Sequence, residues 1–121
     1  MAKYTVHQAA EKFGISAHTL RYYDNAGLFP EMQRDSHGAR IFDDAQLEWL
    51  GLVLCLRSTG LPIADIRHYI ALCAQGDSTL RERYDIILQQ KKRAEDERAE
   101  IDKKLAILSR KASFYEERLK G

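Results

Sequence analysis

The sequence predicts a mainly α-helical protein: a head of four short helices and a β-hairpin, followed by one long helix. Glycine and proline punctuate the chain up to Gly76, whereas neither occurs from 77 to 120. Residues 79–120 place apolar side chains at alternating steps of four and three, which is the heptad pattern of a coiled coil. These observations divide the chain into a head domain, 1–76, and a long coiled-coil helix, 77–121.

Composition indicates a globular protein near neutrality. The 121 residues are 45% hydrophobic and 31% charged, with a formal net charge of +1, which argues against a disordered or disulfide-rich chain. No apolar run reaches the roughly 18 residues of a membrane span, and the first six residues lack the apolar core of a signal peptide. We expect a cytoplasmic protein, with no membrane partner, in which Cys55 and Cys73 are free thiols.

The first two helices are marked by their capping residues. Thr5 and Gln8 form a capping-box pattern, and Gly14 can end the first helix with a positive φ. Ser16 caps a second helix of about 17–26, which another glycine ends. Two short helices joined by a glycine-containing turn of this length are typical of a helix-turn-helix.

Residues 31–42 predict a short β-hairpin. Its centre, Asp35-Ser36-His37-Gly38, has the composition of a turn. A two-stranded hairpin is marginal by itself, so it must pack against the helices. We expect Arg34, His37 and Arg40 to project from its tip, which makes it a wing; a plain surface hairpin is the alternative.

Two further helices complete the head. Asp43 fits a capping pattern at the start of a third helix, which ends at about Ser58 and is apolar nearly all round over 49–56. Such a helix is expected to be covered on more than one side. Pro62 fits the first turn of a fourth helix, and we expect Cys73, on the apolar face of that helix, to lie in the core.

The long helix carries an apolar seam that needs a partner. A head of fewer than 80 residues is too small to cover a helix of roughly 60 Å, at about 1.5 Å per residue. We therefore expect a homodimer, with folding of the helix back onto its own head as the alternative. The helix either continues to 120 or breaks near Ser109, with a separate short helix from about 110. The candidate dimerisation residues are Leu80, Tyr84, Ile87, Ala94, Ile101, Leu105 and Leu108.

The second helix carries hydrogen-bond donors suited to DNA. Arginine offers planar donors for phosphate or guanine, threonine a hydroxyl and tyrosine a phenol. Residues 1–50 hold five Lys and Arg against seven Asp and Glu, so DNA affinity has to come from a few well-placed cations, doubled by dimerisation. One of two adjacent tyrosines is expected in the core. In the alternative, Arg21 pairs with Asp24 and the tyrosines only pack. The candidate contacts to double-stranded DNA are Thr19, Arg21, Tyr22, Tyr23, Arg34, His37 and Arg40.

These residues resemble the sequence pattern of a known protein family. The run Arg21-Tyr22-Tyr23-Asp24 followed by Gly27-Leu28-Phe29-Pro30 resembles the MerR family of bacterial transcription regulators, and the resemblance continues through Gly38-Ala39-Arg40-Ile41-Phe42 into the long helix. Ala39 departs from the tyrosine that members often carry there. The resemblance implies a winged helix-turn-helix homodimer joined by an antiparallel coiled coil. Such proteins bend and untwist a pseudo-palindromic promoter operator so that RNA polymerase engages both promoter elements.

One cysteine suggests what kind of effector the protein senses. The stretch Leu54-Cys55-Leu56-Arg57-Ser58-Thr59-Gly60-Leu61 is similar to that of the aldehyde- and electrophile-responsive branch of the family, which implies a stress response. Cys55 is then a candidate sensing thiol; the alternatives are an inert buried cysteine and a non-covalent effector. The four histidines lack metal-ligand spacing, and we expect no metal, cofactor or enzymatic activity. A coiled-coil adaptor that does not bind DNA is the competing function.

Overall fold

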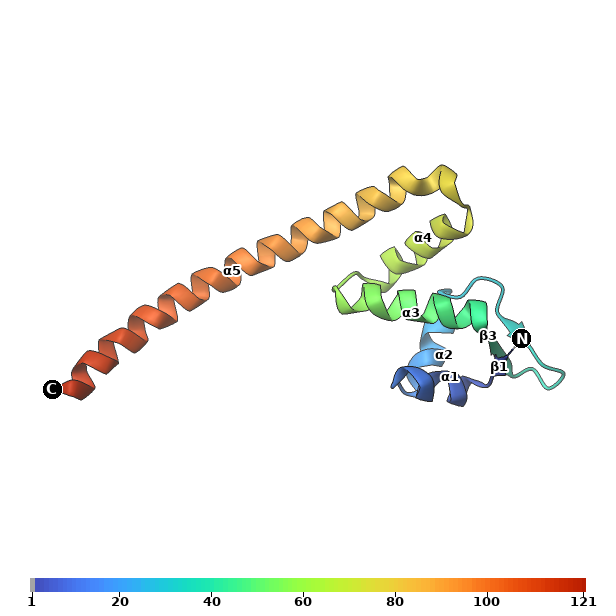
Figure 1. The fold of residues 1–121 in the computed structure, drawn as a ribbon, viewed down its shortest axis with the longest axis horizontal. Helices are drawn as coiled ribbons and strands as arrows, with labels where there is room; N and C mark the ends of the chain where they lie inside the picture. Colours follow the sequence, from blue (N-terminus) through green and yellow to red (C-terminus); the bar gives the residue numbers. More distant parts are fainter. Residues whose placement is uncertain (1) are drawn as a thin grey trace. The chain divides into compact units, whose positions relative to one another are not determined.

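A computed structural model describes residues 2–121 of the chain and confirms the mainly helical class with a small antiparallel sheet (Figure 1). Two compact units result, one ending at Ile86 and the other covering Ile87–Gly121, so the first two turns of the long helix belong to the head unit. The elements are β1 Lys3–Tyr4, α1 Val6–Phe13, α2 Ala17–Asn25, β2 Gln33–Arg34, β3 Arg40–Asp43, α3 Asp44–Ser58, α4 Ile63–Ala74, the short 3₁₀ helix η1 Asp77–Thr79 and α5 Leu80–Lys120.

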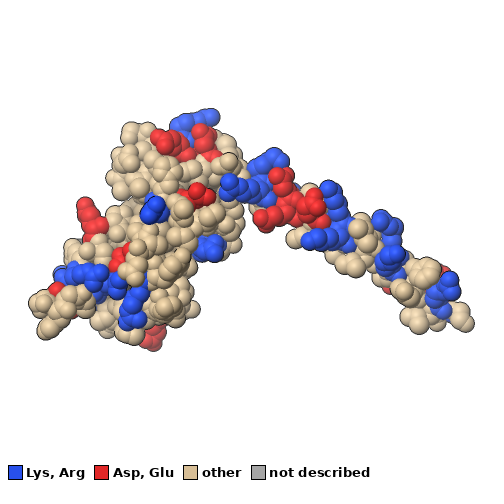
Figure 2. All heavy atoms as spheres, turned by 180° about the vertical axis from the view of Figure 1, so that it is seen from behind, with Lys and Arg blue, Asp and Glu red and all other residues tan. Residues whose placement is uncertain are grey.

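The long helix α5 runs through Ser109 without a break, so of the two alternatives the structure has the continuous helix. Basic side chains recur along it, and acidic side chains gather in its first part (Figure 2). Some of them form ion pairs one turn apart. Lys92 Nζ lies 2.7 Å from Asp96 Oδ1, and this hydrogen bond is the largest cause that raises the pKa of Lys92 above its ordinary value. Such exposed pairs contribute little to stability, because water and salt screen them.

The helix ends of the head follow the predicted capping signals. The Gln8 backbone N–H donates to Thr5 Oγ1 at 3.1 Å, and the Thr5 N–H donates to Gln8 Oε1 at 2.9 Å, which is a complete capping box. Gly14 ends α1 in the left-handed conformation with φ of 69°. The Thr19 N–H donates to Ser16 Oγ at 3.0 Å and opens α2. The predicted helix-turn-helix is therefore present.

The predicted hairpin is confirmed, but it belongs to a three-stranded sheet of order β1-β3-β2. Gln33 pairs with Ile41 in the hairpin, while Tyr4 of β1 pairs with Phe42 on the other side of β3. The strand β1 was not predicted. It makes β3 the central strand, and this arrangement ties the base of the wing to the start of the chain.

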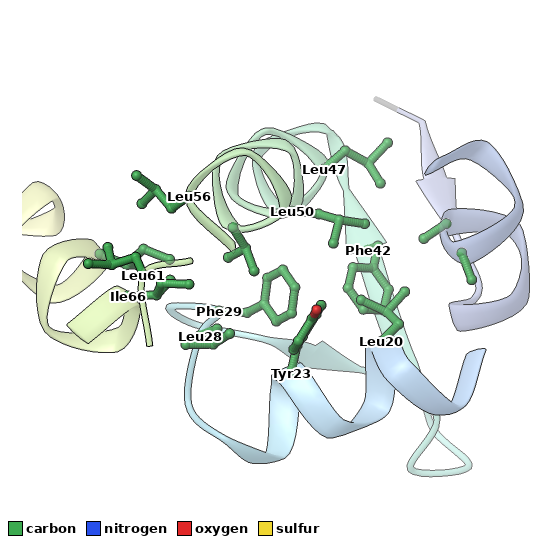
Figure 3. Close-up of a cluster of buried hydrophobic side chains, with 14 residues drawn as sticks. Leu20, Tyr23, Leu28, Phe29, Phe42, Leu47, Leu50, Leu56, Leu61 and Ile66 are labelled. Carbon is green, nitrogen blue, oxygen red and sulfur yellow. The ribbon is translucent and has the colours of Figure 1, made fainter. Parts of the chain in front are cut away.

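The core of the head lies where α2, the sheet and α3 meet (Figure 3). Leu20, Phe42 and Leu50 are completely buried. The rings of Phe29 and Phe42 meet edge to face with centroids 5.6 Å apart, a favourable geometry for aromatic pairs. Burial of this cluster orients α2 against the wing.

The helices α3 and α4 pack on this core with small departures from the predictions. Asp43 caps α3 by accepting from the Gln46 N–H at 2.9 Å. Pro62 is the N-cap of α4 and precedes its first turn. Although α3 is apolar nearly all round, its cover in the single chain is partial: Trp49 is half-buried and Cys55 is exposed.

Candidate nucleic-acid interface

The outward face of α2 holds three of the candidate DNA contacts. Tyr22 is 54% exposed, and Arg21 and Thr19 are half-buried. The Thr19 hydroxyl accepts a hydrogen bond from Ser16 Oγ at 2.9 Å, so the cap of α2 holds this side chain. All three side chains are at least partly accessible, and arginine, tyrosine and threonine provide donors for phosphates and base edges.

Tyr23 is buried and is therefore not available for a contact to DNA. It is only 8% exposed and belongs to the hydrophobic core, and its phenol points inward between α2 and α3 (Figure 3). The prediction that one tyrosine of the pair faces the core is confirmed, and Tyr22 is the outward one. Sequence alone left the choice open because two adjacent residues differ by about 100° around a helix, and the fold decides which of them meets the core.

Arg40 does not project from the wing, contrary to the prediction. Its guanidinium pairs with the carboxylate of Asp24, and the two side chains are only 15% and 11% exposed. Arg40 Nη2 also donates to Asn25 Oδ1 at 2.7 Å. The arginine is therefore occupied in joining β3 to the C-terminal end of α2. The alternative pairing of Arg21 with Asp24 is wrong, because Arg40 takes this carboxylate.

The tip of the wing is built by Asp35. Its Oδ1 accepts from the His37 N–H at 2.8 Å and from the Ala39 N–H at 3.0 Å, which fixes the turn locally. Arg34 Nη1 donates to the Gly38 carbonyl at 2.7 Å across the same turn. Arg34 and His37 are both exposed and remain the candidate DNA contacts of the wing.

A cleft of about 440 Å³ lies between the wing, α2 and the start of the chain. Lys3, His7 and Arg21 line it with Asp35, and Arg21 Nη2 lies 3.3 Å from His7 Nε2. Sequence reasoning missed Lys3 and His7 as parts of this site. No local pattern could have found them, because only the folded head brings His7 to Arg21.

Cys55 is exposed on α3 as a free thiol. The alternative of an inert buried cysteine therefore does not hold for the single chain. The Ser58 hydroxyl donates to the carbonyl of Cys55 at 2.6 Å, which leaves the thiol itself outside this bond. Arg57 donates to the carbonyl of Leu61 at 3.3 Å, so its guanidinium is bound to the loop after α3.

Cys73 is half-buried, and not fully in the core as predicted. Arg83 Nη1 lies 3.8 Å from its Sγ, and the same guanidinium donates to Thr79 Oγ1 and to the Gly76 carbonyl, both at 3.0 Å. Burial is the main cause that raises the pKa of Tyr69, and the neighbouring Cys73 adds to the rise while Arg83 opposes it. Arg83 on α5 is thus hydrogen-bonded to the segment that connects α4 to α5.

Within residues 2–121, no group of three or more His, Cys, Asp or Glu side chains is placed to hold a metal ion. No helix of this part of the chain is long and apolar enough to cross a membrane.

A helix-turn-helix and a wing with donors on their exposed faces define a DNA-binding protein. The family described as "MerR HTH family regulatory protein" matches residues 4–73. The chain belongs to the MerR family of DNA-binding transcriptional regulators.

Individual relatives agree. An "uncharacterized HTH-type transcriptional regulator" of Haemophilus influenzae is 42% identical over 93% of this chain and 84% of its own length. The HTH-type transcriptional regulator AdhR of Bacillus subtilis is 36% identical over 71% of this chain and 61% of its own. The crystal structure of HiNmlR, a MerR family regulator lacking the sensor domain, bound to promoter DNA, is 41% identical. It matches with a TM-score of 0.75 over 96% of this chain and 92% of that one. These relatives are regulators and not enzymes, and they favour DNA binding over the adaptor function.

Proposed function

We propose that this regulator acts as a homodimer whose two heads present α2 and the wing to the two halves of one pseudo-palindromic promoter operator. The observation that carries the proposal is the seam of α5. Among residues 2–121, Tyr22 is the one exposed large apolar side chain that lies outside α5. An apolar stripe of this extent is stabilised when a second helix covers it.

The seam is available to a second copy of the chain. Within the unit Ile87–Gly121, every residue from 91 to 121 is exposed. Leu105 and Leu108 are 54% and 62% exposed at neighbouring core positions of the heptad pattern. The resemblance to MerR regulators supports an antiparallel pairing, with Lys91 and Arg98 as charged seam positions that set the register. The proposed dimer contacts remain Leu80, Tyr84, Ile87, Ala94, Ile101, Leu105 and Leu108.

The DNA contacts proposed for each head are a small set. They combine Thr19, Arg21 and Tyr22 on α2 with Arg34 and His37 on the wing. Because a dimer fixes the separation of its two recognition helices, DNA whose half-sites do not match that separation must bend or untwist to bind. We propose that this deformation brings the promoter elements into register for RNA polymerase. The promoter DNA bound to HiNmlR supports DNA binding by this fold.

We further propose that Cys55 senses an electrophile. The thiol is exposed, and the similarity to AdhR over 71% of the chain supports this branch of the family. A covalent adduct regulates only if it favours one arrangement of the two heads over another. A non-covalent effector is the competing outcome, and the reactivity of the thiol distinguishes the two.

Operator selection tests the dimer and the DNA site together. The full chain would select duplexes from a randomised pool, and the enriched sequence would be read for symmetry. We expect a palindromic consensus, a solution mass twice the 13.9 kDa of one chain, and end-to-end fluorescence transfer that reports a bent duplex. Enrichment of no sequence, or binding as a monomer, would contradict the proposal. An unbent duplex would contradict only the deformation.

A further inference from the structure

Three basic side chains from three different elements meet in the cleft of the head. Lys3 comes from β1, His7 from the first turn of α1 and Arg21 from α2. The closest approach is the 3.3 Å between Arg21 Nη2 and His7 Nε2. His7 is exposed and Arg21 is half-buried, so both can be reached from solvent.

The acidic groups near this cleft are already engaged. Arg40 also lines it, but the carboxylate of Asp24 neutralises that arginine. Asp35 directs Oδ1 to two backbone N–H groups of the wing. Among the ion pairs of residues 2–121, none joins His7 or Arg21 to a carboxylate. The cleft therefore holds His7 and Arg21 without a direct ion pair to a carboxylate, although the Asp35 carboxylate also lines it.

The N-terminal end of α1 adds to the positive charge of the cleft. Thr5 and Val6, at the N-terminal end of the helix, line the same cleft. The N-terminal end of a helix carries a partial positive charge from the aligned peptide dipoles. Together with the side chains it favours an anion, and a phosphate oxygen accepts hydrogen bonds from arginine and protonated histidine alike.

We propose that this cleft is a DNA phosphate site, in which Arg21 and His7 turn from each other to contact the same backbone phosphate, and that His7 takes up a proton when DNA binds. The inference rests on the proposed DNA binding by α2 and deepens it. The phosphate is that of the duplex whose bases meet the exposed face of α2, because Arg21 belongs to both surfaces.

Proton uptake follows from the change of neighbours. Without DNA, the neighbour of the His7 ring is the guanidinium of Arg21, with Nη2 and Nε2 3.3 Å apart. With a phosphate bound to both side chains, a protonated ring gains a charge-assisted hydrogen bond. The other titratable and charged groups around the cleft are Lys3 and Tyr4 of β1, Asp35 of the wing and Arg40 of β3. Because the bound state holds more protons, affinity falls as pH rises through the histidine range.

The test measures the affinity of the full chain for a fluorescent duplex that the wild-type protein has selected. Anisotropy titrations would run between about pH 6 and pH 8, which spans the usual histidine pKa of about 6.5. We expect the wild-type Kd to rise about fivefold over this range, within the limit of one proton per site. His7→Gln should bind equally at both ends, near the wild-type value at high pH. At pH 6 its salt slope should be shallower by about 0.9 for each head, or about 1.8 for the proposed dimer.

A matched histidine and a folding check complete the design. His68→Gln on α4, which is also exposed, should keep the wild-type pH dependence, and circular dichroism melting should show that both variants fold. If His7→Gln keeps the wild-type pH dependence and salt slope, the phosphate site is wrong while DNA binding stands. A loss of equal size at both pH values would also overturn it, because His7 would then only orient Arg21. If the wild-type chain selects no duplex, the proposed function itself fails.

Discussion

The guanidinium of Arg40 on β3 pairs with the carboxylate of Asp24 on α2, and the two side chains are only 15% and 11% exposed. This ion pair joins the base of the wing to the helix that carries Arg21 and Tyr22. Asn25 adds a hydrogen bond to the same guanidinium at 2.7 Å. The two elements of the head that are proposed to contact DNA are thus connected through an ion pair that is largely buried.

Removing one member of this pair should destabilise the head. Arg40→Met leaves the Asp24 carboxylate desolvated without its partner, and we expect a loss of about 2 to 3 kcal/mol in the free energy of unfolding. Urea unfolding at a fixed protein concentration measures it. Arg34→Met, at an exposed arginine of the wing, should change stability by less than about 0.5 kcal/mol. Equal losses in the two variants would contradict the structural role of Arg40.

Replacing Arg21 should weaken operator binding without unfolding the head. Arg21→Ala removes a charged donor from α2, and we expect a loss of about 1–3 kcal/mol, or roughly tenfold to a hundredfold in Kd. Fluorescence anisotropy with the selected duplex measures this loss. Arg110→Ala is the matched control, since Arg110 lies on α5 outside the seam and should leave Kd within a factor of two or so. Unchanged affinity in Arg21→Ala would remove this arginine from the interface.

The two adjacent tyrosines should separate stability from binding. Tyr23→Ala opens a cavity in the core, and we expect it to lower the free energy of unfolding by about 3 kcal/mol or more. Tyr22→Ala should change stability by less than about 0.5 kcal/mol but weaken operator binding, because Tyr22 is 54% exposed. Thermal unfolding and anisotropy on both variants test this division. Normal DNA affinity in Tyr22→Ala would restrict the contacts on α2 to Arg21 and Thr19.

A charge in the seam should dissociate the proposed dimer. Leu105→Lys places an ammonium where a second helix would pack, and we expect the dimer dissociation constant to rise by about thirtyfold or more, equivalent to about 2 kcal/mol. Light scattering after size exclusion, over a dilution series, measures the mass. Ala106→Lys introduces the same side chain one position outside the seam and should leave the dimer intact. Dissociation by both variants, or by neither, would argue against this seam.

The two cysteines should differ in reactivity. Cys55 is exposed, whereas Cys73 is half-buried beside Arg83, so brief treatment with N-ethylmaleimide should label Cys55 several times faster. Peptide mass mapping of the native protein quantifies both sites, and the denatured protein gives the reference rate. If both thiols stay unlabelled until the protein unfolds, the electrophile-sensing proposal loses its support, and a non-covalent effector is favoured.

The helix ends could be predicted because their signals are local. The capping box of Thr5 and Gln8 and the cap of Asp43 each join residues three positions apart, so their hydrogen bonds depend little on the rest of the fold. Gly14, with φ of 69°, takes a conformation that most other residues resist. These signals bounded α1 and opened α3.

The pairings across the fold could not be predicted in the same way. The strand β1 has two residues, too few for any alternation of polar and apolar side chains to show. Arg40 reaches Asp24 across 16 positions and His7 meets Arg21 across 14, and many other partners satisfy the same charges in an unfolded chain. The candidate site was therefore found in outline. In the folded head, Arg40 and Tyr23 are largely buried, and His7 lies in the cleft beside Arg21.

The central position of β3 gives the wing a graded resistance to local opening. At its base, Phe42 is completely buried and pairs with Tyr4, so separating the strands there requires the core to open. At its tip, the turn from Asp35 to Ala39 depends on a few exposed hydrogen bonds. Amide hydrogens should therefore exchange with solvent slowly at the base and rapidly at the tip. A stable base with a more mobile tip would let the proposed DNA contacts Arg34 and His37 shift while the helix-turn-helix keeps its packing.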